Sequence, residues 1–187
     1  MHMPTLKREW TATDRDDLPD DGNRYEVIDG ELFVTPAPAW RHQEAVVQLY
    51  RLLADYLGAE RVGHVVVAPA DVVFSPIRAV QPDLFVVPLA RGRRPERFED
   101  VGRLLLAAEI ISPSSARADR VKKRVLYRDE GVAEYWMVDL DSRTVERSTP
   151  EDVRVDVLAE RMTWAPEGAV HSLEIDLTDY FSRVLDR

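Results

Sequence analysis

The sequence predicts an α/β (α+β) fold in which a mixed β-sheet is flanked by helices, with β-hairpins toward both ends of the chain. Short β-rich runs alternate with amphipathic helical patterns, and the nearly continuous apolar run at 104–111 is typical of a strand buried on both faces. The length of 187 residues, 45% of them hydrophobic, suits a single domain with one core over residues 1–187.

In the first half of the chain, the clearest local feature is a hairpin expected over 24–35, because two strand-like runs flank Asp29-Gly30. Apolar residues spaced at helical intervals predict an amphipathic helix over 40–57, which Gly58 is suited to end. The elements expected next are short strands at 63–67, 71–74 and 81–87 and an exposed basic connection at 91–100.

In the second half, the buried strand at 104–111 is followed by the segment SPSS, where Ser114 or Ser115 offers an N-cap. The helix that begins there is expected to run to about Asp129, and Gly131 suits its C-terminal end. The remaining elements expected are a second hairpin at 134–140 and 144–148, strands at 153–158 and 170–175, and a C-terminal helix from about 178.

The composition excludes several classes of protein. The absence of cysteine excludes disulfides and thiolate metal sites and fits a reducing compartment. The N-terminal segment has no apolar signal region, and no run approaches the roughly 20 apolar residues of a membrane span, so we expect a cytoplasmic protein without a membrane partner. No Gly-rich phosphate loop or G-x-S-x-G elbow supports an NTPase, a dinucleotide-dependent enzyme or an α/β-hydrolase. The net charge of −9 argues against indiscriminate coating of DNA, although a nucleic-acid enzyme can keep a local basic rim.

Three acidic residues, Glu26, Asp83 and Glu109, stand in or beside apolar strand-like runs. Each has a simpler explanation alone: Glu109 could lie half in solvent, Asp83 could be a turn acid after Pro82, and Glu26 would face solvent by strand alternation. Together they indicate a site, because a carboxylate in an apolar strand is costly unless it is paired or bound to a metal. Such a cluster suits Mg²⁺ or Mn²⁺. The four histidines lack zinc-ligand spacing, and His42 could either join the acids or lie at the surface.

The helix after SPSS supplies a candidate cation. Asp119, Lys123 and Tyr127 lie on one side of it, at positions i, i+4 and i+8. Asp119 and Lys123 could form only a surface ion pair worth roughly 0.2–0.5 kcal/mol. Alternatively, the helix could bring the ammonium of Lys123 beside the carboxylates. In the second case the ammonium could stabilise charge on a phosphate or orient an attacking water. Lys122 lies nearer the apolar side of the helix, so periodicity does not choose between Lys122 and Lys123.

The same helix is rich in basic residues, and the connection at 91–100 adds Arg91, Arg93, Arg94 and Arg97. Basic patches of this kind contact phosphates without reading the base sequence. A basic helix can equally be a solvated surface. The candidate nucleic-acid contacts on the helix are Arg117, Arg120, Lys122 and Arg124.

Taken in order, five features are similar to one family: RYEVIDGELFV, VQPDLFVV, AAEIISPSS, the D-x-x-x-K-x-x-x-Y spacing of Asp119, Lys123 and Tyr127, and GVAEYWMVD. The chain resembles the Uma-two family of restriction endonucleases, a branch of the PD-(D/E)XK nuclease superfamily, over about residues 10–145. The resemblance implies a restriction-endonuclease-like core of four or five strands with helices on both faces. Residues 146–187 would then be an extension of this core.

The resemblance also implies the metal ligands. Glu26, Asp83 and Glu109 match the acids of the family motif. They would bind Mg²⁺ or Mn²⁺ together with the backbone carbonyl of Ile110. The chain departs from the superfamily pattern at Ile111, because a lysine is expected there, two residues after the last acid.

In the family that the chain resembles, the lysine has moved to the following helix. The spacing from Asp119 and to Tyr127 assigns this role to Lys123. Lys123 would position or activate the attacking water, and His42, Asp119 and Tyr127 would support the site from behind its ligands.

The implied activity is metal-dependent hydrolysis of phosphodiester bonds in nucleic acid, with DNA as the expected substrate. Cutting both strands calls for two sites, so we expect a homodimer, with the aromatic side chains of Trp164 and Tyr180 as candidates for an exposed interface. Ile111 motivates an alternative, a catalytically silent module that holds nucleic acid or a protein partner. A third reading is a hydrolase that uses paired acids on another substrate.

Overall fold

The computed structural model describes residues 9–98, 101–111 and 116–186, with the backbone alone described at 116–120. Its largest sheet has six strands in the order β10-β9-β8-β7-β6-β3, and we call it the central sheet. Its neighbouring strands pair antiparallel except β7 and β8, which are parallel because a helix connects them. The strands are β3 (Gly63–Val67), β6 (Leu84–Pro88), β7 (Leu106–Ile111), β8 (Tyr135–Asp139), β9 (Thr144–Ser148) and β10 (Asp156–Leu158).

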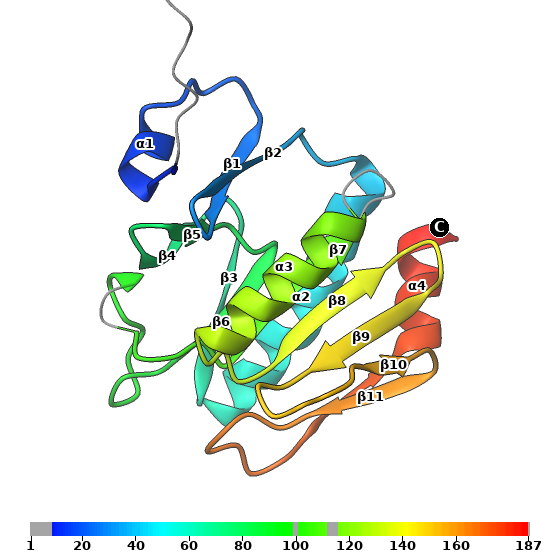
Figure 1. The fold of residues 1–187 in the computed structure, drawn as a ribbon. Coiled ribbons are helices and arrows are strands. Elements are labelled where there is room, and N and C mark those ends of the chain that lie inside the picture. The colour runs from blue at the N-terminus through cyan, green and yellow to red at the C-terminus, as the bar shows by residue number, and fades with distance from the viewer. Residues whose placement is uncertain (1–8, 99–100, 112–115, 187) are drawn as a thin grey trace, which may run out of the picture.

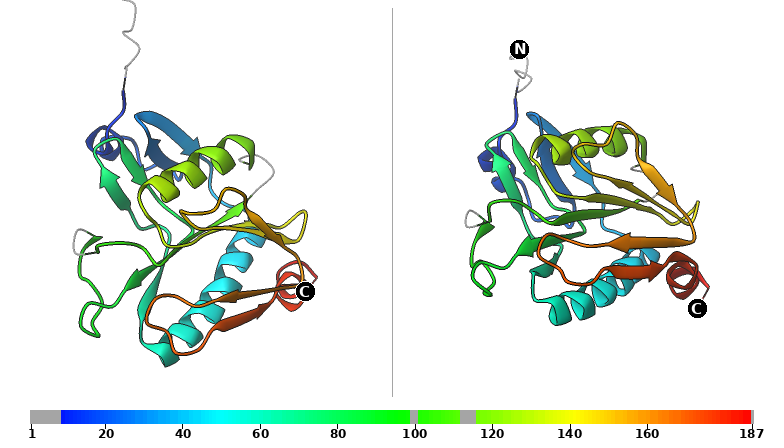
Figure 2. Two further views of the ribbon diagram at one scale, coloured as in Figure 1. Left: turned by 60° about the horizontal axis from the view of Figure 1, so that its bottom comes forward. Right: turned by 90° about the horizontal axis from the view of Figure 1, so that it is seen from below.

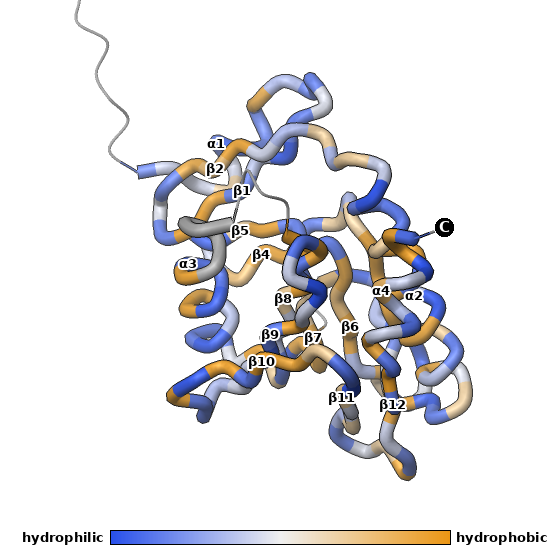
Figure 3. The backbone as a smooth tube through the Cα atoms, turned by 90° about the vertical axis from the view of Figure 1, so that its right-hand side faces the viewer, coloured by the Kyte–Doolittle hydropathy of each residue, from blue (hydrophilic) through white to orange (hydrophobic). Residues whose placement is uncertain are grey.

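Helices cover both faces of the central sheet, as Figure 1 and the view from below in Figure 2 show. One face packs against α2 (Trp40–Glu60) and α4 (Leu177–Leu185), and the other packs against α3 (Ala116–Asp129). Side chains alternate along β6, so that Leu84 and Val86 join the first core cluster while Phe85 and Val87 join the second. In Figure 3, β6 is an almost unbroken hydrophobic stretch between these layers. The predicted class of a mixed sheet between helices is confirmed, with six strands where four or five were expected.

The N-terminal part forms a smaller sheet in the order β2-β1-β5-β4, and α1 (Ala12–Asp16) precedes it. The predicted hairpin around Asp29-Gly30 is confirmed: both residues have positive φ, 50° and 77°, as a type I′ turn requires. Ile28, Val72 and Val80 of this sheet join the core cluster on the α3 side of the central sheet. The sheet therefore brings the hairpin over that face. Its strands are β1 (Arg24–Ile28), β2 (Glu31–Thr35), β4 (Val72–Ser75) and β5 (Arg78–Val80).

The two predicted helix ends had different outcomes. Gly131 ends α3 as expected: it has φ 66°, and the Gly131 and Val132 amides donate to the carbonyls of Arg128 and Tyr127 at 3.0 and 2.9 Å. The prediction that Gly58 ends α2 was wrong. The helix continues to Glu60, and Arg61 takes the left-handed conformation that caps it.

The C-terminal part contributes to the same core through α4 and the two-stranded sheet β11 (Arg161–Trp164) and β12 (Leu173–Asp176). Trp164 is 2% exposed and packs edge-on against Trp136 with ring centroids 5.6 Å apart. The Tyr180 ring is also buried, and its hydroxyl donates to the carbonyl of Ala45 at 3.0 Å. The proposal of an exposed interface at Trp164 and Tyr180 was therefore wrong. Among the helices in the described residues, none is long and apolar enough to cross a membrane.

Two glycines give a matched test of this backbone. Gly58→Ala should raise the free energy of unfolding by up to about 1 kcal/mol, because the position is helical and a Cβ meets nothing within 4 Å. Gly131→Ala should lower it by about 1–2 kcal/mol, because the Cβ has space but the φ of 66° is strained for alanine. Urea denaturation of both variants checks the opposite signs, and equal shifts would contradict the assigned end of α3.

Candidate active site

Four charged side chains meet on the face of the central sheet that α3 covers. Asp83 directly precedes β6 and Glu109 lies in β7, and the antiparallel register that pairs Leu84 with Ala108 brings these two acids to neighbouring positions. Glu26 reaches the cluster from β1 and Lys123 from α3. All four are buried, with exposed fractions of 2% for Glu26, 2% for Asp83, 8% for Glu109 and 5% for Lys123. We call these four residues the acid cluster.

Lys123 connects two of the acids. Its Nζ lies 2.8 Å from Glu26 Oε2 and 2.9 Å from Glu109 Oε1, and the Tyr127 hydroxyl donates to the same Glu109 oxygen at 3.0 Å. Lys122 points elsewhere: it pairs with Glu31 and lies over the ring of Phe33, 4.8 Å from the centroid. Of the two lysines between which periodicity did not choose, Lys123 is the one that contacts the acids.

Asp83 is held on both of its carboxylate oxygens. Oδ2 accepts hydrogen bonds from the Ile110 amide at 2.8 Å and lies 3.0 Å from His42 Nε2. Oδ1 accepts from Arg24 Nη2 at 2.7 Å. His42 therefore contacts Asp83 and helps to orient its carboxylate. The alternative that His42 lies at the surface was wrong.

Sequence reasoning missed Arg24, which contacts the acid cluster from β1. The sequence does contain a signal for Arg24: Arg24 and Glu26 are two residues apart in a strand, so their side chains point to the same face. The expectation that Glu26 alone would face solvent was wrong, because α3 packs against β1 and its Lys123 contacts the Glu26 carboxylate. The Glu26 carboxylate also accepts from the Gln81 amide at 2.9 Å.

The charges of the cluster do not balance. Three carboxylates face the cations of Lys123 and Arg24, which leaves one formal negative charge in excess. Burial and the charges of Asp83 and Glu26 raise the pKa of Glu109 to about 7, although Lys123 opposes the shift. Burial would also raise the pKa of Asp83, but the hydrogen bond with His42 and the charge of Arg24 outweigh it and lower that pKa to about 2. For Lys123, burial works against the charged form, but Glu109 and Glu26 raise its pKa well above the usual range. When Glu109 is ionised, the one excess negative charge favours binding of a further cation.

The donor atoms fit a hard divalent cation. The Ile110 amide points to Asp83, and in a strand the carbonyl of the same residue points to the same side, so the Ile110 carbonyl also faces the cluster. Carboxylate and carbonyl oxygens are the ligands that Mg²⁺ and Mn²⁺ prefer. Among the described residues, no three acidic or histidine side chains already converge on one point. Lys123 and Arg24 lie between the carboxylates instead.

Several predicted residues do not join the cluster or fall outside the described part. Arg124 lines a pocket with Arg128 and Ser148, and none of the four acid-cluster residues lines it. Residues Ser114 and Ser115, and the side chains of Arg117, Asp119 and Arg120, lie outside the described part of the chain.

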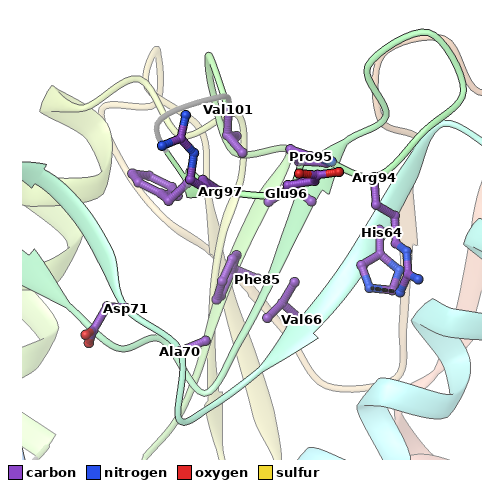
Figure 4. A pocket seen from close by; sticks show the side chains of 12 residues that line it. His64, Val66, Ala70, Asp71, Phe85, Arg94, Pro95, Glu96, Arg97 and Val101 are labelled. Carbon is purple, nitrogen blue, oxygen red and sulfur yellow. Dashed lines mark hydrogen bonds between the residues drawn. The ribbon is translucent and has the colours of Figure 1, made fainter.

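A separate pocket of about 340 Å³ lies farther along the same face, where Val66 and Phe85 form part of the lining and Arg94 and Arg97 come from the basic connection (Figure 4). None of the acid-cluster residues lines it. The pocket and the acid cluster are therefore distinct features of this face.

Replacing Lys123 tests the ion pairs. Lys123→Met should lower the free energy of unfolding by about 3–5 kcal/mol, because it leaves two buried carboxylates without their shared cation. Lys122→Met, on the same helix and half-exposed, should change it by at most about 1 kcal/mol. Urea denaturation of the metal-free proteins measures both, and similar losses would show that Lys123 is not the buried partner.

The raised pKa of Glu109 gives a pH dependence. A carboxyl whose pKa is higher in the folded state, about 7 against 4.5, favours folding fully below pH 4.5 and loses that contribution as the pH rises through 7. The free energy of unfolding of the metal-free protein should therefore fall more steeply between pH 5 and 8 in the wild type than in Glu109→Gln. Parallel profiles for the two proteins would contradict the raised pKa.

Comparison with known proteins agrees with this architecture. The sequence model of the family described as "Uma2: Putative restriction endonuclease" matches residues 12–178. A comparison with curated proteins found no match. The crystal structure of "a putative nuclease belonging to DUF820 from Anabaena variabilis ATCC 29413" superposes with a TM-score of 0.77 at 21% identity, covering 94% of this chain and 99% of that one. At this identity the structural likeness establishes the fold alone, whereas the family match spans most of the sequence. The chain therefore belongs to the Uma2 family.

Proposed function

We propose that this protein is a metal-dependent endonuclease that hydrolyses phosphodiester bonds of nucleic acid, with DNA as its substrate. The observation that carries the proposal is the buried acid cluster, in which Asp83 and Glu109 come from adjacent strands and Lys123 lies 2.9 Å from Glu109. A purely structural core has little reason to bury three carboxylates, because each costs free energy unless cations and donors compensate it. Membership of the nuclease family agrees with this reading.

The ion that we propose is Mg²⁺ or Mn²⁺. Asp83, Glu109 and the Ile110 carbonyl would hold it, with Glu26 as a further acid at the site. When bound, such an ion supplies Lewis-acid stabilisation of the scissile phosphate and of the attacking water. The hydrogen bonds to Asp83 from His42 and the Ile110 amide fix the orientation of that carboxylate before any ion arrives.

Lys123 supplies the positive charge of the mechanism. Its pKa is raised by Glu109 and Glu26 in spite of burial, so the ammonium stays protonated at neutral pH. It can then donate hydrogen bonds to an attacking water and stabilise the negative charge that develops on the phosphate. Tyr127 donates to the same Glu109 oxygen and so orients the acid that Lys123 contacts. The lysine of the site thus comes from α3 and takes the place of the lysine that the superfamily motif has at the position of Ile111 in β7.

A second candidate is the catalytically silent module, which would hold nucleic acid or a protein partner without cutting. It is favoured by the resident cations Lys123 and Arg24, which already occupy the space between the acids. A net charge of −9 also weakens non-specific binding to DNA.

Under the nuclease proposal the active form is a homodimer, because cleavage of a duplex on both strands requires two sites.

A cleavage assay separates the two candidates. The wild type should cut plasmid, single-stranded DNA or RNA in Mg²⁺ or Mn²⁺ and not in EDTA, and Asp83→Asn should reduce cutting to background because a metal ligand is lost. Asp29→Asn in the β1–β2 turn, outside the cluster, is the matched control and should keep full activity. Calorimetry with Mn²⁺ should show binding that Asp83→Asn removes. Metal binding without cutting of any substrate would favour the silent module, and no metal binding at all would overturn the nuclease proposal.

A further inference from the structure

Arg24 lies beside the acid cluster, at the start of the segment RYEVIDGELFV, and is not one of the acids that match the family motif. Its Nη2 is 2.7 Å from Asp83 Oδ1, and its Nη1 is 3.9 Å from Glu109 Oε2. The same Nη1 donates to the backbone carbonyl of Gln81 at 3.1 Å. The guanidinium therefore lies between the two carboxylates that we propose as metal ligands.

The oxygens that Arg24 faces are those that an ion would need. Asp83 Oδ2 is occupied by His42 and the Ile110 amide, and Glu109 Oε1 is occupied by Lys123 and Tyr127. The remaining oxygens are Asp83 Oδ1 and Glu109 Oε2, and Arg24 is the cation beside both of them. A divalent ion that binds these two oxygens must take the place of the guanidinium.

The environment of Arg24 fits a cation that can be released. Its side chain is 17% exposed, in contrast to 6% for Lys123, so Arg24 is the cation of the site with more contact with solvent. Burial works against its charge, yet the charges of Asp83 and Glu109 raise its pKa in this position. After displacement the guanidinium still stays protonated at neutral pH, because its ordinary pKa is already far above 7. A guanidinium has a planar fork of donors that matches phosphate oxygens, which a lysine lacks.

We propose that Arg24 is the resident counter-ion of the metal-free site, that a divalent ion displaces it from Asp83 and Glu109, and that the displaced guanidinium then contacts the scissile phosphate. This inference rests on the proposed nuclease function. It explains how three carboxylates remain buried before the ion arrives, because Arg24 and Lys123 together supply two of the three compensating charges. It also predicts that metal affinity and cleavage respond to Arg24 in opposite directions.

The test is Arg24→Gln, with Arg78→Gln as the matched control. Arg78 is also an arginine paired with acids, at 2.6 Å from Asp29 and 2.7 Å from Glu130, but it lies outside the acid cluster. By calorimetry, Arg24→Gln should bind Mn²⁺ roughly tenfold more tightly than the wild type, because a competing unit charge is removed. Its cleavage rate at saturating Mn²⁺ should fall roughly 100-fold, because a phosphate contact is lost. Arg78→Gln should match the wild type in both measurements.

The outcomes separate this inference from the function on which it rests. If the wild type binds Mn²⁺ and Arg24→Gln binds it no more tightly, the counter-ion role is overturned while the nuclease proposal stands. Tighter binding with undiminished cleavage would overturn the phosphate contact. If neither protein binds Mn²⁺, the proposed function fails, and this inference fails with it.

A measurement on the wild-type protein does not depend on the folding of the variant. In the metal-free protein the Arg24 guanidinium protons, held by Asp83 and Gln81, should exchange slowly with water in side-chain NMR spectra. Saturating Mg²⁺ should make them exchange fast, because the hydrogen bond to Asp83 is broken. Signals that stay unchanged at saturating Mg²⁺, in a protein that calorimetry shows to bind it, would overturn the displacement.

Discussion

The burial of three carboxylates on one face of a β-sheet is the constraint on which the rest of this structure depends. An ionised carboxyl away from water is tolerated only where cations and hydrogen-bond donors lie at contact distance. Lys123 contacts two of the acids, Arg24 contacts the third, and Tyr127, His42 and backbone amides complete the set. These partners come from β1, β7, α2 and α3 and from the segment before β6, so the site holds together elements that are far apart in the sequence.

The position of α3 follows from the same constraint. The helix connects the parallel strands β7 and β8, and its C-terminal end is fixed by the hydrogen bonds around Gly131. Tyr127, one turn beyond Lys123, is fully buried and packs on Tyr135 of β8 with ring centroids 4.8 Å apart. Packing of this tyrosine holds α3 against the sheet, where Lys123 contacts Glu109. A lysine on a packed helix can thus supply the cation that a strand lysine would supply at position 111. Ile111 itself packs against the apolar cluster on the α3 side.

Much of this arrangement could be predicted from the sequence, and the failures have physical causes. The hairpin at Asp29-Gly30, the long helix α2 and the buried strand β7 have strong local patterns, and all three are confirmed. The short strands β5 and β11 were missed because three or four residues carry too little periodicity. For the candidate site, the three acids stood out because charge is rare in apolar strands. Periodicity did not choose between Lys122 and Lys123 as the cation of the site, because a helical wheel gives the side of the helix on which a residue lies but not the element that packs against that side. The partner Arg24 was missed because its role depends on a contact with Asp83, 59 positions away.

The most direct test of the proposed metal centre is anomalous X-ray diffraction from crystals soaked in Mn²⁺. We expect a single strong peak within coordination distance of Asp83 Oδ1, Glu109 Oε2 and the Ile110 carbonyl, at the place that Arg24 covers in the metal-free protein. A peak elsewhere on the surface, or none at a concentration where calorimetry shows binding to be saturated, would contradict the claim that this acid cluster is a metal centre.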